Sequence, residues 1–356
     1  MNKIRIKIVR RCADGKSDFI INQFPDRSTT VGKHQFVFDP QCEDYDWLVA
    51  IDNLPENISK FGMMDLHCDP SQTILICTEP SDVTYYGKWF ANQFEHLVTN
   101  QDEHALPHAN ARRIPNSLWF YGKEYNQIID DTDKDIAKTD LISGIATDKS
   151  EGHTAHKKRF DFLQLASKRI DELEILYSYR DKEKIFTQIF GKSVKYVKSK
   201  HEMIDRYKYH LAIGNQQGKN IITERILDCF LGHAVPISFG CTNLSDHFPE
   251  KSFIDIDIND PSGAISTIKS IIYDTNDYLS RLESVKKARS IVISKFNLIT
   301  TIIEIVENSQ PAEKERMIER RERMYSRRLC RFLCLSDFLG FAKFKIKIFF
   351  CKYRRQ

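Results

Sequence analysis

The sequence predicts an α/β protein whose parallel sheets are divided between two domains. Short apolar runs separated by polar turns recur through the first 130 residues, and strand and helix patterns alternate from residue 157 onward. This alternation is typical of parallel layers, whose strands are buried on both faces. A chain of 356 residues has room for two hydrophobic cores, because a domain takes roughly 150 residues.

The composition excludes several classes of protein. Apolar residues make up 41% of the chain and charged residues 29%, and no apolar run approaches the length of about 18 residues that spans a bilayer. Nine scattered cysteines without a Cys-x-x-Cys pair indicate neither a disulfide framework nor a zinc ribbon. The amino terminus alternates cations with Ile and Val, which predicts a strand and lacks the apolar core of a secretory signal. A cytoplasmic location is therefore expected.

The first domain is predicted over residues 1–138. After the opening strand, buried strands are predicted where apolar residues run together, at Trp47–Ile51, Thr73–Cys77 and His96–Thr99. A polar segment, residues 130–135, is the predicted linker to the second domain.

The second domain is predicted over residues 139–308, where the two hydrophobic periods alternate most clearly. Helices are predicted at residues 157–170, 223–231 and 265–282, and strands at residues 172–177, 209–213 and 235–239. Strands alternating with helices in this order predict a parallel sheet.

One segment of the second domain carries chemistry. Residues 207–225 bring a strand into a polar loop with glycines, and the loop then opens a helix. Nucleotides and phosphates bind at such places, because the free amides and the dipole of the helix favour negative charge. The residues alone leave two interpretations open, an anion or nucleotide site and an ordinary strand-to-helix turn.

The same segment resembles the signature of the family 10 fucosyltransferases. In order, the matching residues are Tyr207, Lys208, Asn215, Gly218, Thr223, Glu224, Ile226, Asp228, Pro236, Ile237 and Gly240, followed by residues 248–249 and 252–254. The resemblance implies a GT-B fold, in which two Rossmann-like domains face a cleft. It also implies an inverting glycosyltransferase that moves L-fucose from GDP-β-L-fucose to a glycan hydroxyl. The expected acceptor position is O3 of N-acetylglucosamine or glucose, in a glycan such as a lipopolysaccharide O-antigen.

The resemblance assigns roles to five residues. Asn215 and Glu224 would orient the donor, with Glu224 on the ribose or the fucose. Arg159 and Arg225 would neutralise the departing diphosphate, since a guanidinium holds two phosphate oxygens at once. Glu79, at the end of a predicted strand, would be the base that takes the acceptor proton. From the residues alone, a solvated strand-terminal acid at Glu79 and a solvated basic helix start at Arg159 remain alternatives.

Three positions depart from the family pattern. Gly214 stands where the family usually has glutamate, Ile221 where many members have tyrosine, and Arg225 where lysine is usual. A transferase of the same fold with a different GDP-sugar donor, or a weakly active or non-catalytic nucleotide-sugar-binding protein, is therefore the alternative function.

No metal or other cofactor is expected. Asp255 and Asp257 have the Asp-x-Asp spacing with which other transferases hold a metal on the phosphates. The resemblance places them in a strand and its exit loop, and catalysis in the family uses no bound metal. Cys330 and Cys334 lack a neighbouring histidine, and burial on an apolar helix face explains them more simply.

Residues 309–356 form a separate tail, predicted to be helical, basic and amphipathic. Residues 312–356 hold 14 Lys/Arg against 5 Asp/Glu, a net charge of +9, which leaves −5 for the rest of a chain whose total is +4. Aromatic and aliphatic residues lie among these cations, as in helices that rest on an anionic membrane. A peripheral position on the cytoplasmic face of the inner membrane is expected. Packing of the tail on its own enzyme is an alternative, and nucleic-acid binding is disfavoured because the body is acidic.

Overall fold

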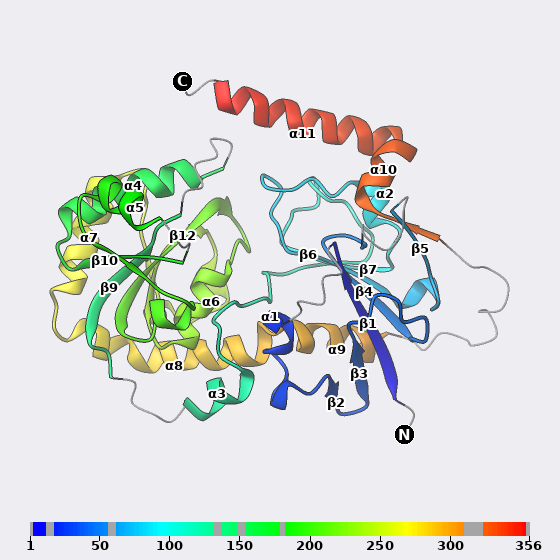
Figure 1. Cartoon of the computed structure of the whole chain (residues 1–356), viewed down its shortest axis with the longest axis horizontal. Coiled ribbons are helices and arrows are strands. Elements are labelled where there is room, and N and C mark those ends of the chain that lie inside the picture. The colour runs from blue at the N-terminus through cyan, green and yellow to red at the C-terminus, as the bar shows by residue number, and fades with distance from the viewer. Residues whose placement is uncertain are drawn as a thin grey trace. The chain divides into compact units, whose positions relative to one another are not determined.

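The chain folds into two compact units. The computed structural model describes residues 3–11, 18–55, 62–131, 137–147, 154–178, 182–309 and 323–353 (Figure 1). The first unit comprises Met1–Asn116 and Leu298–Gln356, and the second comprises Ser117–Asn297. These boundaries differ from the predicted ones, since the chain returns to the first unit at Leu298, whose amide donates to Gln23 Oε1 at 3.3 Å.

The first unit is built on a seven-stranded sheet with the order β2-β3-β1-β4-β6-β7-β8. The strands are β1 (Ile4–Arg10), β2 (Thr30–Val31), β3 (His34–Val37), β4 (Trp47–Ile51), β6 (Thr73–Cys77), β7 (His96–Thr99) and β8 (Ala111–Arg113). All neighbours pair in parallel except β2 and β3. The three predicted apolar strands are confirmed to the residue, and β4 and β6 are buried along their whole length.

Helices and a two-stranded ribbon complete the first unit. The helices are α1 (Asp18–Ile21), α2 (Lys88–Ala91), α9 (Leu298–Asn308), α10 (Arg327–Leu333) and α11 (Leu335–Tyr353), and the ribbon pairs β5 (Met63–Asp65) with β15 (Arg323–Tyr325) antiparallel. The helical C-terminal region is thus present. The prediction of a helical tail was wrong at β15, where pairing with β5 supplies the backbone hydrogen-bond partners that a helix would have supplied. Residues 310–322 and 354–356 of the predicted tail lie outside the described residues.

The second unit has a fully parallel six-stranded sheet with the order β11-β10-β9-β12-β13-β14. Its strands are β9 (Asp140–Ile145), β10 (Leu173–Tyr177), β11 (Val194–Tyr196), β12 (Tyr207–Gly218), β13 (Val235–Cys241) and β14 (Ile254–Asp255). Its helices are α3 (Tyr125–Asp130), α4 (His156–Arg169), α5 (Glu183–Phe190), α6 (Glu224–Leu231), α7 (Pro261–Ile272) and α8 (Asp277–Lys295). The α/β class and the parallel sheets predicted from the sequence are confirmed.

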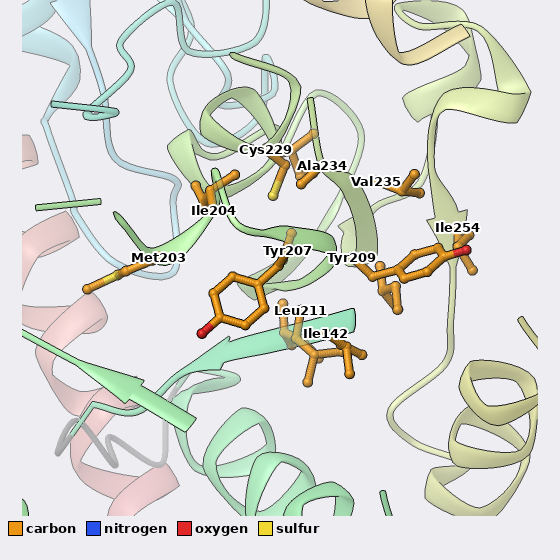
Figure 2. Packing of buried hydrophobic residues seen from close by; sticks show 14 of the residues in the cluster. Ile142, Met203, Ile204, Tyr207, Tyr209, Leu211, Cys229, Ala234, Val235 and Ile254 are labelled. Atoms are coloured by element: carbon orange, nitrogen blue, oxygen red, sulfur yellow. The ribbon is translucent and has the colours of Figure 1, made fainter. Parts of the chain in front are cut away.

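The core of the second unit forms around its central strands. Ile142, Tyr209, Leu211 and Val235 from three adjacent strands are among the buried side chains that pack there (Figure 2). All four are at most 3% exposed. The central strands β9, β12 and β13 are therefore fixed, and the loops at their carboxyl ends start from rigid positions.

One predicted helix and one predicted strand differ from the observed elements. The helix predicted at residues 265–282 is in fact α7 and α8, separated by a turn in which Asp274 Oδ1 accepts the amide of Asn276 at 2.9 Å. Strand β12 continues beyond the predicted residues 209–213 to Gly218, which pairs with Cys241 of β13. Among the helices of the described ranges, none is long and apolar enough to cross a bilayer.

Candidate functional site

The turn between β12 and α6 is held in one conformation. Asn220 has a positive φ of 59°, a conformation that asparagine tolerates better than most residues. Its amide donates to Asn243 Oδ1 at 2.8 Å, and its own side-chain oxygen lies 2.9 Å from His247 Nε2. The start of α6 therefore has a defined position relative to the carboxyl end of β12.

Arg159 lies across the carboxyl ends of two strands of the same sheet. It comes from the first turns of α4 and is 7% exposed. Its Nη1 is 3.5 Å from the carbonyl oxygen of Ile213, and its Nη2 is 3.3 Å from Thr147 Oγ1. The backbone of Asn215 is tied to the same helix, because its carbonyl accepts the amide of Ala155 at 2.7 Å. Arg159 is thus buried beside the central strands β9 and β12, and the solvated alternative is wrong.

Cations surround Glu224 at the first position of α6. Burial acts to raise the pKa of Glu224, but the charges of Lys200, Arg225 and Arg159 outweigh burial and hold that pKa below its ordinary value. Lys200 Nζ lies 3.6 Å from Glu224 Oε1. Glu224 therefore stays ionised at neutral pH, as an acceptor of hydrogen bonds, within a region that favours anions.

Lys200 is a member of the site that the sequence did not assign to it, and Asp228, which matches the family signature, had been given no role there. Lys200 Nζ lies 3.1 Å from Asp228 Oδ2, and Asp228 Oδ1 accepts the amide of Phe120 at 2.9 Å. Burial, and secondarily the charge of Glu224, raise the pKa of Asp228 to about 6 although Lys200 opposes them. The spacing of four residues on α6 could have pointed from Glu224 to Asp228. Lys200 had no such signal in its lysine-rich segment.

His210 lies in β12, near these cations, and is neutral. Burial, then the charges of Arg225 and Lys200, lower its pKa to about 3. Ser143 Oγ donates its one proton to the carbonyl oxygen of Met203 at 2.9 Å. In the 2.7 Å hydrogen bond between His210 Nδ1 and Ser143 Oγ, the ring nitrogen is therefore the donor. The ring is fixed as a structural donor and does not serve as a base here.

Two buried oxygen atoms near the start of α6 lack a hydrogen-bond partner among the described residues. They are Thr223 Oγ1 and Gln216 Oε1. Thr223 is the N-cap of α6, yet its side chain makes no capping bond, which leaves its hydroxyl available to another group. Buried polar atoms are nearly always paired in native proteins, so this corner is suited to a polar, anionic ligand.

Gly214 has a structural explanation. A Cβ at Gly214 would lie 2.9 Å from the carbonyl oxygen of Phe239, and a Cβ at Gly240 would lie 2.7 Å from that of Gln216. Gly240 also has a φ of +130°. The strands β12 and β13 approach each other here beside a shift of register, so the glutamate usual in the family does not fit without movement of the backbone. The neighbouring departure, Ile221, is buried.

Glu79 lies in the first unit, two residues after β6, and is exposed. Its backbone is held on both sides, since its amide donates to Tyr86 Oη at 3.2 Å and its carbonyl accepts from Gln101 Nε2 at 2.9 Å. The four predicted donor residues, Arg159, Asn215, Glu224 and Arg225, all belong to the second unit. The structure thus places the four predicted donor residues in one unit, and their roles and that of Glu79 stay predictions.

The carboxylates of the Asp-x-Asp pattern have local structural partners. Ser238 Oγ donates to Asp255 Oδ1, and Asp257 Oδ1 accepts the amide of Asn259 at 2.9 Å. Asp260 caps α7 through the amide of Gly263 at 3.1 Å. In the part of the chain that the structure describes, no three His, Cys, Asp or Glu side chains gather into a possible metal site.

Sequence comparison matches residues 162–317 to the model of the glycosyltransferase family 10 (fucosyltransferase) C-terminal domain. An 87-residue stretch is 36% identical to an α-(1,3)-fucosyltransferase of Helicobacter pylori. That stretch is 24% of this chain and 18% of the relative, so the alignment spans under a fifth of the relative's length.

Solved structures show a similar fold. A crystal structure of α1,3-fucosyltransferase with GDP gives a TM-score of 0.50 at 16% identity, covering 87% of this chain and 92% of the other. The Anabaena protein HepE in complex with UDP-glucose gives a TM-score of 0.52 at 12% identity, covering 85% and 98%. At these identities the likeness concerns the fold alone, and it agrees with the two parallel α/β units.

Proposed function

We propose that this chain transfers L-fucose from GDP-β-L-fucose to a glycan hydroxyl. The proposal starts from the match of residues 162–317 to the C-terminal domain of the family 10 glycosyltransferases. The H. pylori relative is named as an α-(1,3)-fucosyltransferase, which supports O3 of N-acetylglucosamine or glucose as the acceptor position. A lipopolysaccharide O-antigen is the proposed kind of acceptor.

The start of α6 carries this proposal. An ionised Glu224, an unpaired Thr223 hydroxyl, Lys200 and Arg225 lie there within the residues that match the family, and Arg159, three residues before the matched range, adds a third cation. A diphosphate needs cations and free amides, and a ribose offers two hydroxyl groups to a carboxylate. In the proposed complex Arg159 and Arg225 bind the diphosphate, Glu224 accepts from the sugar hydroxyls, and Asn215 orients the donor.

The proposed reaction is a single displacement. A β-linked donor and an α-linked product have opposite anomeric configurations, so one attack by the acceptor oxygen joins them with inversion. The new bond forms between that oxygen and the anomeric carbon, while the bond from this carbon to the diphosphate breaks and GDP leaves with the electron pair. Glu79 takes the proton of the acceptor hydroxyl. Arg159 and Arg225 stabilise the charge that builds on GDP.

The function is tested with radiolabelled GDP-fucose, a β-galactosyl-N-acetylglucosamine acceptor and EDTA. We expect a fucosylated product at an undiminished rate in EDTA, because protein cations perform the task that a metal ion performs elsewhere. Nuclear magnetic resonance of the product should give an α-linked fucose. The absence of a fucosylated product would reject the proposed function. A β-linked product would instead reject the single displacement, and dependence on a divalent ion would reject the role given to the arginines.

A different GDP-sugar donor is the second candidate, favoured by the packing of Gly214. The site has no carboxylate where the family usually has one, and Ile221 supplies no hydroxyl to the donor. Competition of GDP-fucose with GDP-mannose in the same assay separates the two candidates, because the true donor gives the higher kcat/KM.

We also propose that α11 rests on an anionic membrane surface at the cytoplasmic face. One side of the helix faces the first unit through Asp337, Phe344 and Lys347. The residues of the opposite side are large, apolar and 46–71% exposed: Leu335, Phe338, Leu339, Ile346, Phe349 and Phe350. Their spacing places them in one stripe, with the exposed Lys343 and Lys345 at its two edges. An apolar stripe between cations suits a surface of anionic lipids.

The triple substitution of Ile346, Phe349 and Phe350 by serine should release the protein from vesicles that contain phosphatidylglycerol. We expect at least about a tenfold loss of co-sedimentation, since each large apolar side chain contributes about 1.5–3 kcal/mol when it leaves water. Serine at the exposed Tyr273 and Leu279 of the second unit is the matched control. Equal sedimentation of the triple variant and the wild-type protein would contradict the membrane role.

A further inference from the structure

The C-terminal segment, residues 323–353, is built into the first unit. Strand β15 pairs with β5 in the register Arg323 with Asp65 and Tyr325 with Met63. The side chain of Gln93 forms two hydrogen bonds to the same strand: it accepts from the amide of Tyr325 at 2.7 Å and donates to the carbonyl oxygen of Tyr325 at 3.0 Å. This segment is therefore a structural part of the unit that carries Glu79.

A buried carboxylate of the segment completes helix α2. Asp337 is 1% exposed, and its two oxygens accept the amides of Trp89 at 3.1 Å and Phe90 at 3.2 Å. Gly87 precedes the helix with a φ of +94°, and a side chain there would collide with Asp337. The segment thus supplies the N-terminal cap that α2 does not have in its own sequence.

The same segment contacts the loop that directly follows Glu79, which we call the Glu79 loop and define as residues 80–87. Lys347 Nζ lies 2.9 Å from Asp82 Oδ1, and Arg331 Nη2 donates to the carbonyl of Tyr85 at 3.3 Å. The ring of Phe344 lies 6.3 Å from that of Tyr85. Contacts from α10 and α11 therefore extend along this loop.

Arg327 extends these contacts to the backbone of Glu79 through a second side chain. Its guanidinium lies 5.1 Å from the ring centroid of the fully buried Tyr86. Tyr86 Oη accepts the amide of Glu79 and donates its proton to Asp52 Oδ1. Asp52 also accepts the amide of Thr78 at 2.7 Å.

A second contact secures the position of Arg327. Its own amide donates to Asn53 Oδ1 at 2.8 Å, and Asn53 directly follows Asp52 in the chain. Arg327 is therefore fixed at the carboxyl ends of β4 and β6, beside the residues that set the backbone of Glu79.

From these contacts we infer that Arg327 is a positioning residue for Glu79, and that the C-terminal segment serves the acceptor half of the reaction in addition to any surface it binds. The inference rests on the proposed function, which gives Glu79 the acceptor proton. Arg327 acts on the Tyr86 ring, Tyr86 on the Glu79 amide, and the amide on the direction of the carboxylate. Loss of Arg327 then affects transfer to the acceptor and leaves the donor site of the second unit unchanged.

The test compares Arg327→Ala with Arg328→Ala, which removes the exposed neighbouring cation on α10. In the R327A enzyme we expect kcat/KM for β-galactosyl-N-acetylglucosamine to fall roughly tenfold, in line with a partly buried cation–π contact. GDP affinity by calorimetry and acceptor-independent hydrolysis of GDP-fucose should match those of the wild-type and R328A enzymes. R327K should recover part of the transfer rate, because lysine keeps the cation.

Tyr86→Phe provides a second variant, since it keeps the ring and removes the hydroxyl that accepts from Glu79. It should reproduce the selective loss of transfer. Normal transfer by R327A and Y86F would overturn the inference, and so would a loss of GDP affinity equal to the loss of transfer, which indicates general damage to the fold. A wild-type protein that turns over no GDP-fucose would count against the proposed function instead.

Discussion

Glu224→Gln should lower GDP affinity and kcat/KM for GDP-fucose by about 100-fold or more. The amide keeps the size of the side chain but loses the charge, and charge-assisted hydrogen bonds are worth about 1.5–3 kcal/mol each. Two such bonds to sugar hydroxyls account for a loss of that order. In the free protein Lys200 then keeps Asp228 as its remaining carboxylate partner, because it contacts both groups. Calorimetry with GDP and steady-state kinetics measure the two quantities.

Glu183→Gln is the matched control for this change. Glu183 is also a first-turn glutamate, at the start of α5 in the same unit, and it is exposed. Its substitution should leave both constants within about threefold of the wild-type values. If E224Q behaved like E183Q, Glu224 would not belong to the donor site.

Glu79→Gln should reduce kcat for transfer by a factor of about 10² to 10⁴, the usual contribution of a general base. Glutamine has the same shape but cannot take the acceptor proton. GDP affinity should stay unchanged, because the proposed donor residues belong to the second unit and Glu79 to the first. Single-turnover transfer to the disaccharide acceptor measures the chemical step directly.

Glu95→Gln controls for a lost surface charge in the first unit. Glu95 is exposed like Glu79 but precedes β7, at the amino end of the sheet rather than the carboxyl end. The E95Q enzyme should transfer fucose at the wild-type rate. A kcat for E79Q above a tenth of the wild-type value would remove Glu79 from the proton-transfer step.

Buried strands were the most predictable part of the fold. Thr73–Cys77 is covered on both faces, so each of its positions must be apolar or internally bonded, and its limits are visible in the sequence. Arg323–Tyr325 has no such signal, since three residues beside a run of charges become a strand only through pairing with β5. Its position depends on a partner about 260 residues away.

Some residues of the candidate site could likewise be predicted from local sequence, and others could not. Glu224 and Arg225 could be found because they follow one another in a motif at a helix start, whose chemistry is local. Lys200 could not be found in this way, because its contact with Asp228 forms only in the folded chain, between residues 28 positions apart. The absence of a carboxylate at Gly214 was visible in the sequence, but its cause, the close approach of Gly240, exists only between two paired strands.

The divided first unit affects the order in which the protein is assembled on the ribosome. Strand β5 lacks its ribbon partner and α2 lacks its cap until residues 323–337 have been synthesised. At about 5–20 residues per second, the roughly 200 residues that separate them from β8 take on the order of 10–40 s. The contiguous second unit, Ser117–Asn297, is synthesised within this interval and is complete before β15 begins. During this interval the nascent first unit exposes a strand edge to other chains, so chaperones should matter most there.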